Sequence, residues 1–175
     1  GARWNYLAAW GAARRAGLDP RAFLTAIFSR TPVLDSGARA SASTFVQRGM
    51  GDVLLCWENE AFLARQEFPG QGLEIVWPSV SIRAEPPVAV VDEMARRRGT
   101  LAAARAYLEF LYSPEAQAIG ARHYFRPTHQ ETYRQFENTF RNIPTFTVNE
   151  EFGGWRNAHE IHFREGGIFD ELYRP

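Results

Sequence analysis

The sequence predicts an α/β fold, because short apolar strands alternate along it with helical segments. Three compact apolar runs bounded by turn residues have the pattern of strands, at residues 52–57, 73–78 and 86–91. The segments around them repeat apolar residues at helical spacing. With 45% hydrophobic and 23% charged residues among 175, the composition is that of a globular domain rather than a disordered chain.

The first half of the chain is expected to contain four helices. The first runs from the start of the chain to about residue 15, and the second follows Asp19 and Pro20, a typical cap and first helical residue. Residues 35–37 read as a turn that opens a third helix, which ends near residue 48. The fourth helix, over residues 58–68, lies between the first two strands.

The second half repeats the alternation less clearly. The run 86–91 contains two prolines, which favours an edge strand. A helix is expected over residues 100–111, and Ser113 and Pro114 open another that reaches about residue 121. The strands are few for so many helices, and the chain opens directly on a helix. We therefore expect the sequence to be part of a larger protein.

Charge and cysteine content argue against several classes of function. Twenty basic and twenty acidic residues cancel, which does not suit a nucleic-acid binder that relies on bulk positive charge. Cys56 is the only cysteine, so neither an intramolecular disulfide nor a cysteine zinc site can form. Its apolar neighbours predict a small buried hydrophobic residue. No apolar run approaches the roughly 18 residues of a membrane span.

Two helix starts in this sequence have the residues that an oxyanion site needs. The first N–H groups of a helix lack partners within it and carry partial positive charge, and small residues let an anion approach them. Gly1 and Ala2 open the first helix, and residues 35–38 open the third. Trp57 ends a strand and offers one indole N–H donor. Its alternative role is that of a core tryptophan at a strand end.

A series of stretches, in order along nearly the whole chain, resembles the signature sequences of the periplasmic sulfate-binding protein family. They are residues 1–11, 33–40, 44–54, 57–61, 84–88, 112–115, 124–127, 152–155 and 166–170. The family consists of receptors that deliver an oxyanion to an ABC-type importer. The resemblance implies part of a two-lobed periplasmic-binding-protein fold of type II, which closes over its ligand about a hinge.

The resemblance also implies three ligand-binding residues. Gly1 matches the last member of a small-residue triplet that opens the first helix, Ala38 supplies a backbone N–H, and Trp57 supplies its indole N–H. The family's other ligands belong to segments upstream of Gly1, so we expect this chain to hold part of the pocket. A pocket of donors alone suits sulfate, which carries no proton near neutral pH. Arg39 is expected to brace the Ala38 segment, and the alternative is that it faces solvent.

The same resemblance implies the division of the chain, its partners and its location. Residues 1–82 would be the remainder of the second, ligand-bearing lobe, and residues 83–175 would return toward the first lobe. The expected partners are sulfate or thiosulfate, the importer's membrane permease, and either a missing amino-terminal half or a swapped copy of the chain. The expected location is periplasmic, with no cofactor. Sulfate and thiosulfate stay equally open, and another tetrahedral oxyanion such as molybdate is an alternative.

Two rival functions belong to other classes. An enzyme could use His159 and His162, whose spacing can share a metal, but no third ligand is evident and the zinc-hydrolase spacing is absent. No Ser/His/Asp arrangement stands out, so we expect neither a catalytic nor a metal site. An interaction module without a ligand would be favoured if the tryptophans and tyrosines of the tail were exposed.

Overall fold

The computed structural model describes residues 2–173, which form two compact units. The first unit contains the residues up to Ala84 and those from Ile143 onward, and the second runs from Glu85 to Asn142. The predicted division at residues 82 and 83 concerns the lobes of a larger receptor and stays a prediction. Among the described residues, no helix combines the length and the apolar character that crossing a bilayer requires.

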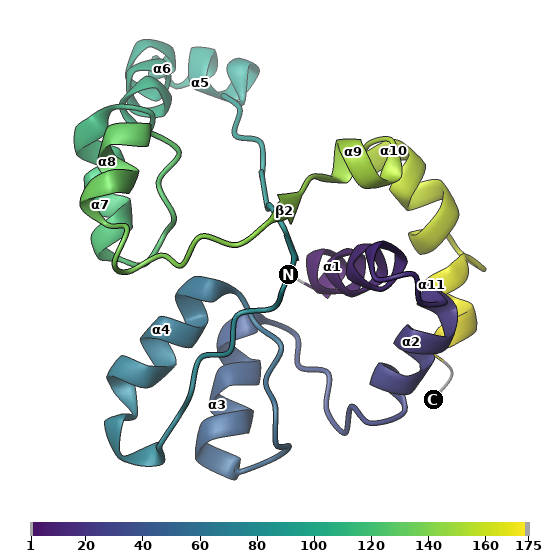
Figure 1. The fold of residues 1–175 in the computed structure, drawn as a ribbon. Helices are drawn as coiled ribbons and strands as arrows, with labels where there is room; N and C mark the ends of the chain where they lie inside the picture. Colours follow the sequence, from purple (N-terminus) through teal and green to yellow (C-terminus); the bar gives the residue numbers. More distant parts are fainter. Residues whose placement is uncertain (1, 174–175) are drawn as a thin grey trace. The chain divides into compact units, whose positions relative to one another are not determined.

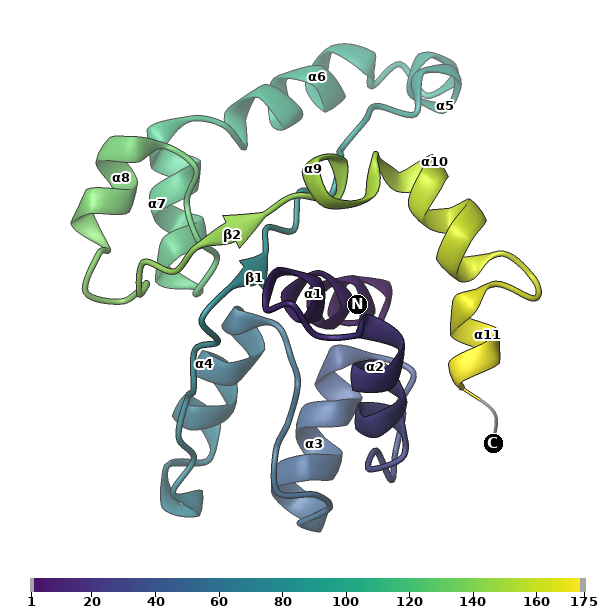
Figure 2. The ribbon, with the colours of Figure 1, turned by 45° about the vertical axis from the view of Figure 1, so that its right-hand side comes forward.

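The first unit is mostly helical, with one small sheet (Figures 1 and 2). Helices α1 and α2 pack against each other, as do α3 and α4. In chain order its elements are α1 (Ala2–Arg15), α2 (Pro20–Phe28), α3 (Ala38–Arg48), α4 (Glu58–Glu67), the 3-10 turn η1 (Pro69–Gln71), β1 (Ser81–Ile82), β2 (Thr145–Phe146), α9 (Val148–Phe152), α10 (Trp155–Ala158), the π-helical segment η2 (His159–Phe163) and α11 (Ile168–Leu172).

The second unit is a set of four short helices in the described chain. They are α5 (Asp92–Arg97), α6 (Leu101–Phe110), α7 (Pro114–Arg122) and α8 (Gln130–Gln135). Its buried side chains include Ala121 and Phe140, whereas α6 has no buried residue although most of its residues are apolar.

Two predicted helix starts are confirmed by capping bonds. A carboxylate oxygen of Asp19 accepts from the backbone N–H of Arg21 at 2.9 Å, with Pro20 in the first position of α2. In the second unit, the Ser113 hydroxyl accepts from the backbone N–H of Ala116 at 3.2 Å. These side chains satisfy N–H groups that have no partner within the helix. The capping residues therefore set where both helices begin.

The core of the first unit joins α1 to the carboxy-terminal segment. Tyr6 and Leu7 of α1 are buried with Leu24, Phe146 and Ala158. Strand β2 brings Phe146 there by pairing in parallel with β1, with Ile82 opposite Phe146. A buried carboxylate adds to this packing of the carboxy-terminal segment on α1, because Glu151 accepts from Arg14 at 2.6 Å and from Arg15 at 2.9 Å.

The predicted strands are wrong for this structure. Residues 52–57, 73–78 and 86–91 form no strand in the described chain, and the only sheet there is the β1–β2 pair. The apolar pattern of a strand is a local signal, but a strand also needs a neighbour whose backbone groups complete its hydrogen bonds. Val53 and Val76 remain 77% and 79% exposed. The α/β prediction is thus supported only by a small parallel pair.

Candidate functional site

The start of α3 presents backbone donors that no side chain caps. Ala38 is its first residue, and the N-cap Gly37 is extended, with φ −166° and ψ 161°. No capping hydrogen bond from a side chain is formed there, and the first turn holds no acidic residue. Since the first N–H groups of a helix have no partner inside it and carry partial positive charge, this end can take an anion.

Trp57 is the N-cap of α4 and is half-buried. Within residues 2–173, no acceptor takes its indole N–H, whereas the indole of Trp77 donates to Glu58 at 3.2 Å. An indole N–H usually finds a partner when it is buried. Trp57 therefore keeps a donor that a ligand can use, in addition to packing at the end of its segment.

The first turn of α1 lies beside the segment that carries Trp57. The ring of Trp4 meets that of Trp57 edge to face, with centroids 6.3 Å apart. The side-chain amide of Asn5 donates to the carbonyl oxygen of Leu55 at 3.3 Å. The structure thus brings the start of α1 to Trp57. Gly1, the third predicted ligand residue, lies outside the described residues.

Trp4 and Asn5 could not be predicted as part of this site, because the contacts of both join residues about fifty positions apart. The one feature of the sequence that could have indicated them is their position near the start of α1, because that helix start was already a candidate anion site.

Arg39 braces the predicted site, as expected, but it does so between two helices. Its guanidinium reaches two carboxylates on α4, Glu60 at 3.5 Å and Glu67 at 2.5 Å. The elements that carry Ala38 and Trp57 are therefore tied together. Both carboxylates in the first turn of α4 have a partner within the chain: Glu60 pairs with Arg39, and Glu58 accepts a hydrogen bond from the indole of Trp77.

The Arg39→Ala substitution is expected to lower the free energy of unfolding by less than about 1 kcal/mol, because exposed ion pairs are screened by water. The Arg39 side chain is about half exposed. Urea unfolding followed by tryptophan fluorescence would measure the change. Arg48→Ala, at the other end of α3, is the matched control, and a loss above about 2 kcal/mol would contradict a solvent-screened brace.

Cys56 is half-buried and His162 is buried in the structure. Burial, aided by the negative charge of Glu60, raises the pKa of the Cys56 thiol to about 11, which keeps it protonated at neutral pH. The ring of His162 is buried, with its Nδ1 3.0 Å from the hydroxyl oxygen of Tyr6. Among the described residues, no group of three or more His, Cys, Asp or Glu is placed to hold a metal.

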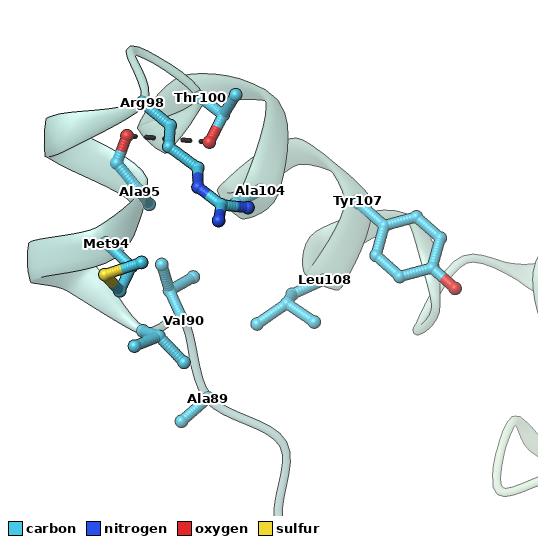
Figure 3. A pocket seen from close by; sticks show the side chains of 10 residues that line it. Ala89, Val90, Met94, Ala95, Arg98, Thr100, Ala104, Tyr107 and Leu108 are labelled. Carbon is cyan, nitrogen blue, oxygen red and sulfur yellow. Dashed lines mark hydrogen bonds between the residues drawn. The ribbon is translucent and has the colours of Figure 1, made fainter.

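A hollow of about 270 Å³ opens in the second unit between α5, α6 and the segment before them (Figure 3). Val90, Met94, Ala104 and Leu108 make most of its lining apolar, and Arg98 extends over it. An apolar lining offers an inorganic dianion few hydrogen bonds. This hollow is therefore a poorer candidate for an oxyanion than the start of α3.

Comparison with known proteins gives consistent matches. Residues 4–126 match the family model described as bacterial extracellular solute-binding protein. The chain is 51% identical to the sulfate-binding protein of Escherichia coli K12 over 98% of its own length and 54% of that protein. It is 44% identical to the thiosulfate-binding protein of Pseudomonas aeruginosa (99% of this chain, 53% of that one). For the thiosulfate-binding protein of E. coli K12 the identity is 40% (98% and 52%). The chain spans about half the length of the curated relatives it matches.

Proposed function

Since the chain belongs to the bacterial extracellular solute-binding protein family, we propose that it is part of a receptor that binds sulfate or thiosulfate. The relatives with this specificity match it along almost its whole length. The relatives are named for binding these anions, and a receptor binds and releases its solute unchanged. The proposed role is therefore transport rather than catalysis.

The uncapped start of α3 is the observation that carries this proposal. It presents backbone N–H groups, beginning at Ala38, without a side-chain cap or an acidic neighbour in the first turn. Trp57 adds an indole N–H that is unused among the described residues. A site of donors alone suits a dianion without protons, whereas a protonated anion would also need an acceptor. We propose Ala38, Trp57 and Gly1 as ligand residues.

The whole receptor would have a two-lobed fold of type II that closes over the anion about a hinge. The parallel β1–β2 pair is compatible with such an α/β fold. Segments 52–57 and 73–78 have the apolar pattern of strands but form no ladder in the described chain, so strands from elsewhere could pair with them. We propose that the part of the receptor corresponding to the rest of the relatives' length, or a swapped copy, supplies them.

The remaining partners follow from the receptor role. The closed receptor would dock on the membrane permease of an ABC-type importer and release the anion there. This role places the receptor in the periplasm. No cofactor takes part, because binding by backbone and indole donors needs none.

The Ala38→Pro substitution tests the site directly. Proline is well tolerated at the first position of a helix, and the extended Gly37 before it has the conformation that a residue preceding proline prefers. The change therefore removes one N–H with little effect on the fold. A hydrogen bond to a charged acceptor contributes about 1.5–3 kcal/mol, so we expect sulfate to bind roughly 10- to 100-fold more weakly.

Calorimetric titration would measure this loss, with the chain alone and with the chain mixed with the part of the E. coli sulfate-binding protein that it does not span. Gln130→Pro, at the first position of α8 after the extended His129, is the matched control. Phosphate is the control anion. Unchanged sulfate affinity in Ala38→Pro would exclude Ala38 as a ligand residue, and phosphate binding as strong as sulfate binding would contradict a site of donors alone.

A further inference from the structure

Three tryptophans from distant parts of the chain form a ladder that ends at the proposed anion donor. Trp57 meets Trp4 with ring centroids 6.3 Å apart and planes at 60°. Trp4 in turn meets Trp155 at 4.8 Å and 82°, a close edge-to-face contact. Trp57 is the N-cap of α4, Trp4 lies in the first turn of α1, and Trp155 is the first residue of α10. We call these three residues the tryptophan ladder.

A pair of glycines places the last ring of the ladder. Gly153 and Gly154 join α9 to α10 with φ values of 68° and 94°, which side chains rarely adopt. Asn157 holds the turn by donating to the carbonyl oxygen of Phe152 at 2.6 Å. The proposed ligand set gives no role to the stretch 152–155. In the structure this stretch turns the chain so that Trp155 meets Trp4.

We propose that Trp155 is a positioning residue, which acts through Trp4 to hold the indole of Trp57 in the orientation that presents its N–H to the anion. This proposal rests on the proposed function of Trp57. A donor held in place before binding avoids the cost of ordering a free side chain when the ligand arrives. The ladder provides this support because Trp155 contacts Trp4 and Trp4 contacts Trp57.

The setting of the ladder supports a positioning role over core packing alone. Its three rings are half-buried; Trp4 and Trp155 pack against the buried core, whereas Trp57 is not among the side chains packed on it. Trp10, from the same helix as Trp4, instead packs on Tyr6 and His162. Replacing Trp155 therefore removes the ring that supports Trp4, while the ring contacts of Trp10 with Tyr6 and His162 do not involve it.

The test compares Trp155→Leu with Trp155→Phe by nuclear magnetic resonance of the indole N–H groups. The chain has five tryptophans, so each contributes one indole signal, and Trp57→Phe assigns the signal of Trp57. In Trp155→Leu we expect the Trp57 signal to shift or broaden in the absence of sulfate, and Trp155→Phe to restore it. Sulfate affinity should fall about 3- to 10-fold in the leucine variant and recover in the phenylalanine variant.

Phe23→Leu, at a partly exposed aromatic residue of α2, is the matched control and should leave the Trp57 signal in place. An unchanged Trp57 signal in a folded Trp155→Leu variant would overturn the proposal. If that variant does not fold, Gly154→Ala replaces it, because a side chain at φ 94° strains the turn that directs Trp155. Failure of the proposed function would appear separately, as a wild-type Trp57 signal that does not respond to sulfate when the rest of the receptor is supplied.

Discussion

We expect the Phe146→Ala substitution to lower the free energy of unfolding of the first unit by about 3–5 kcal/mol, which is the usual cost of truncating a buried phenylalanine. Phe146 is 1% exposed and lies in β2. Its ring packs so closely on α1 that a Cβ atom at Gly11 would lie 2.4 Å from the Phe146 Cζ atom. The guanidinium of Arg15 lies above the same ring, 4.9 Å from its centroid.

Such a loss is large compared with the free energy of unfolding of a typical domain, which is about 5–15 kcal/mol. Urea unfolding followed by tryptophan fluorescence would measure it, and all five tryptophans belong to the first unit, so the signal reports that unit alone. Phe125→Ala, at a position 59% exposed in the second unit, is the matched control and should change this transition by no more than about 0.5 kcal/mol. A Phe146→Ala effect below about 1 kcal/mol would mean that β2 does not anchor the carboxy-terminal segment on α1.

The second large effect is a loss of stability in acid that depends on His162. Its side chain is 4% exposed and packs among the rings of Tyr6, Trp10 and Phe152. Burial, together with the positive charges of Arg21 and Arg14, lowers the pKa of His162 to about 4. Burial also raises the pKa of Tyr6 well above its usual value, so the phenol stays protonated beside the imidazole.

The sign of the pH dependence follows from these values. An unfolded histidine has a pKa of about 6.5, so between about pH 6.5 and pH 4 the unfolded chain binds a proton that the folded chain does not. The stabilisation is complete above about pH 6.5, declines as the pH falls, and is lost below about pH 4. A difference of about 2.5 pKa units corresponds to roughly 3 kcal/mol.

Urea unfolding of the wild type and of His162→Gln between pH 4 and pH 7 would test this prediction. Glutamine keeps a polar group near Tyr6 but does not titrate, so the variant should lose less stability on acidification than the wild type. His123→Gln, at an exposed position, is the control, and its free energy of unfolding should depend on pH as that of the wild type does. If the free energy of unfolding fell with pH equally in the wild type and in His162→Gln, the result would contradict a buried neutral imidazole at His162.

The helices of this chain were predictable to a large extent. The pair Asp19 and Pro20 predicts one helix start, and the pair Ser113 and Pro114 predicts another. The structure confirms both. Helix hydrogen bonds join residues four apart, so the signals that start a helix lie next to it in the sequence. The strands were not predictable in this way, because 52–57 and 73–78 have a strand pattern without a pairing partner in the described chain.

The candidate site was predictable only in part. Ala38 and Trp57 follow from the resemblance of their stretches to the family signatures, and the structure places them at helix starts with available donors. Their role as ligands stays a prediction, as does that of Gly1. The contacts of Trp4 with Trp57 and Trp155 could not be predicted, because no local pattern reports which rings meet across long separations.

The sequence by itself determined where most helices begin and which family the chain resembles, because capping residues and signature stretches are local features. The tertiary structure alone decided that β2 pairs with β1, that Glu151 joins Arg14 and Arg15, and that Trp155 supports Trp4. Each of these contacts joins residues more than sixty positions apart. Such contacts depend on how the whole chain buries its apolar surface, and the order of residues in any one segment does not encode them.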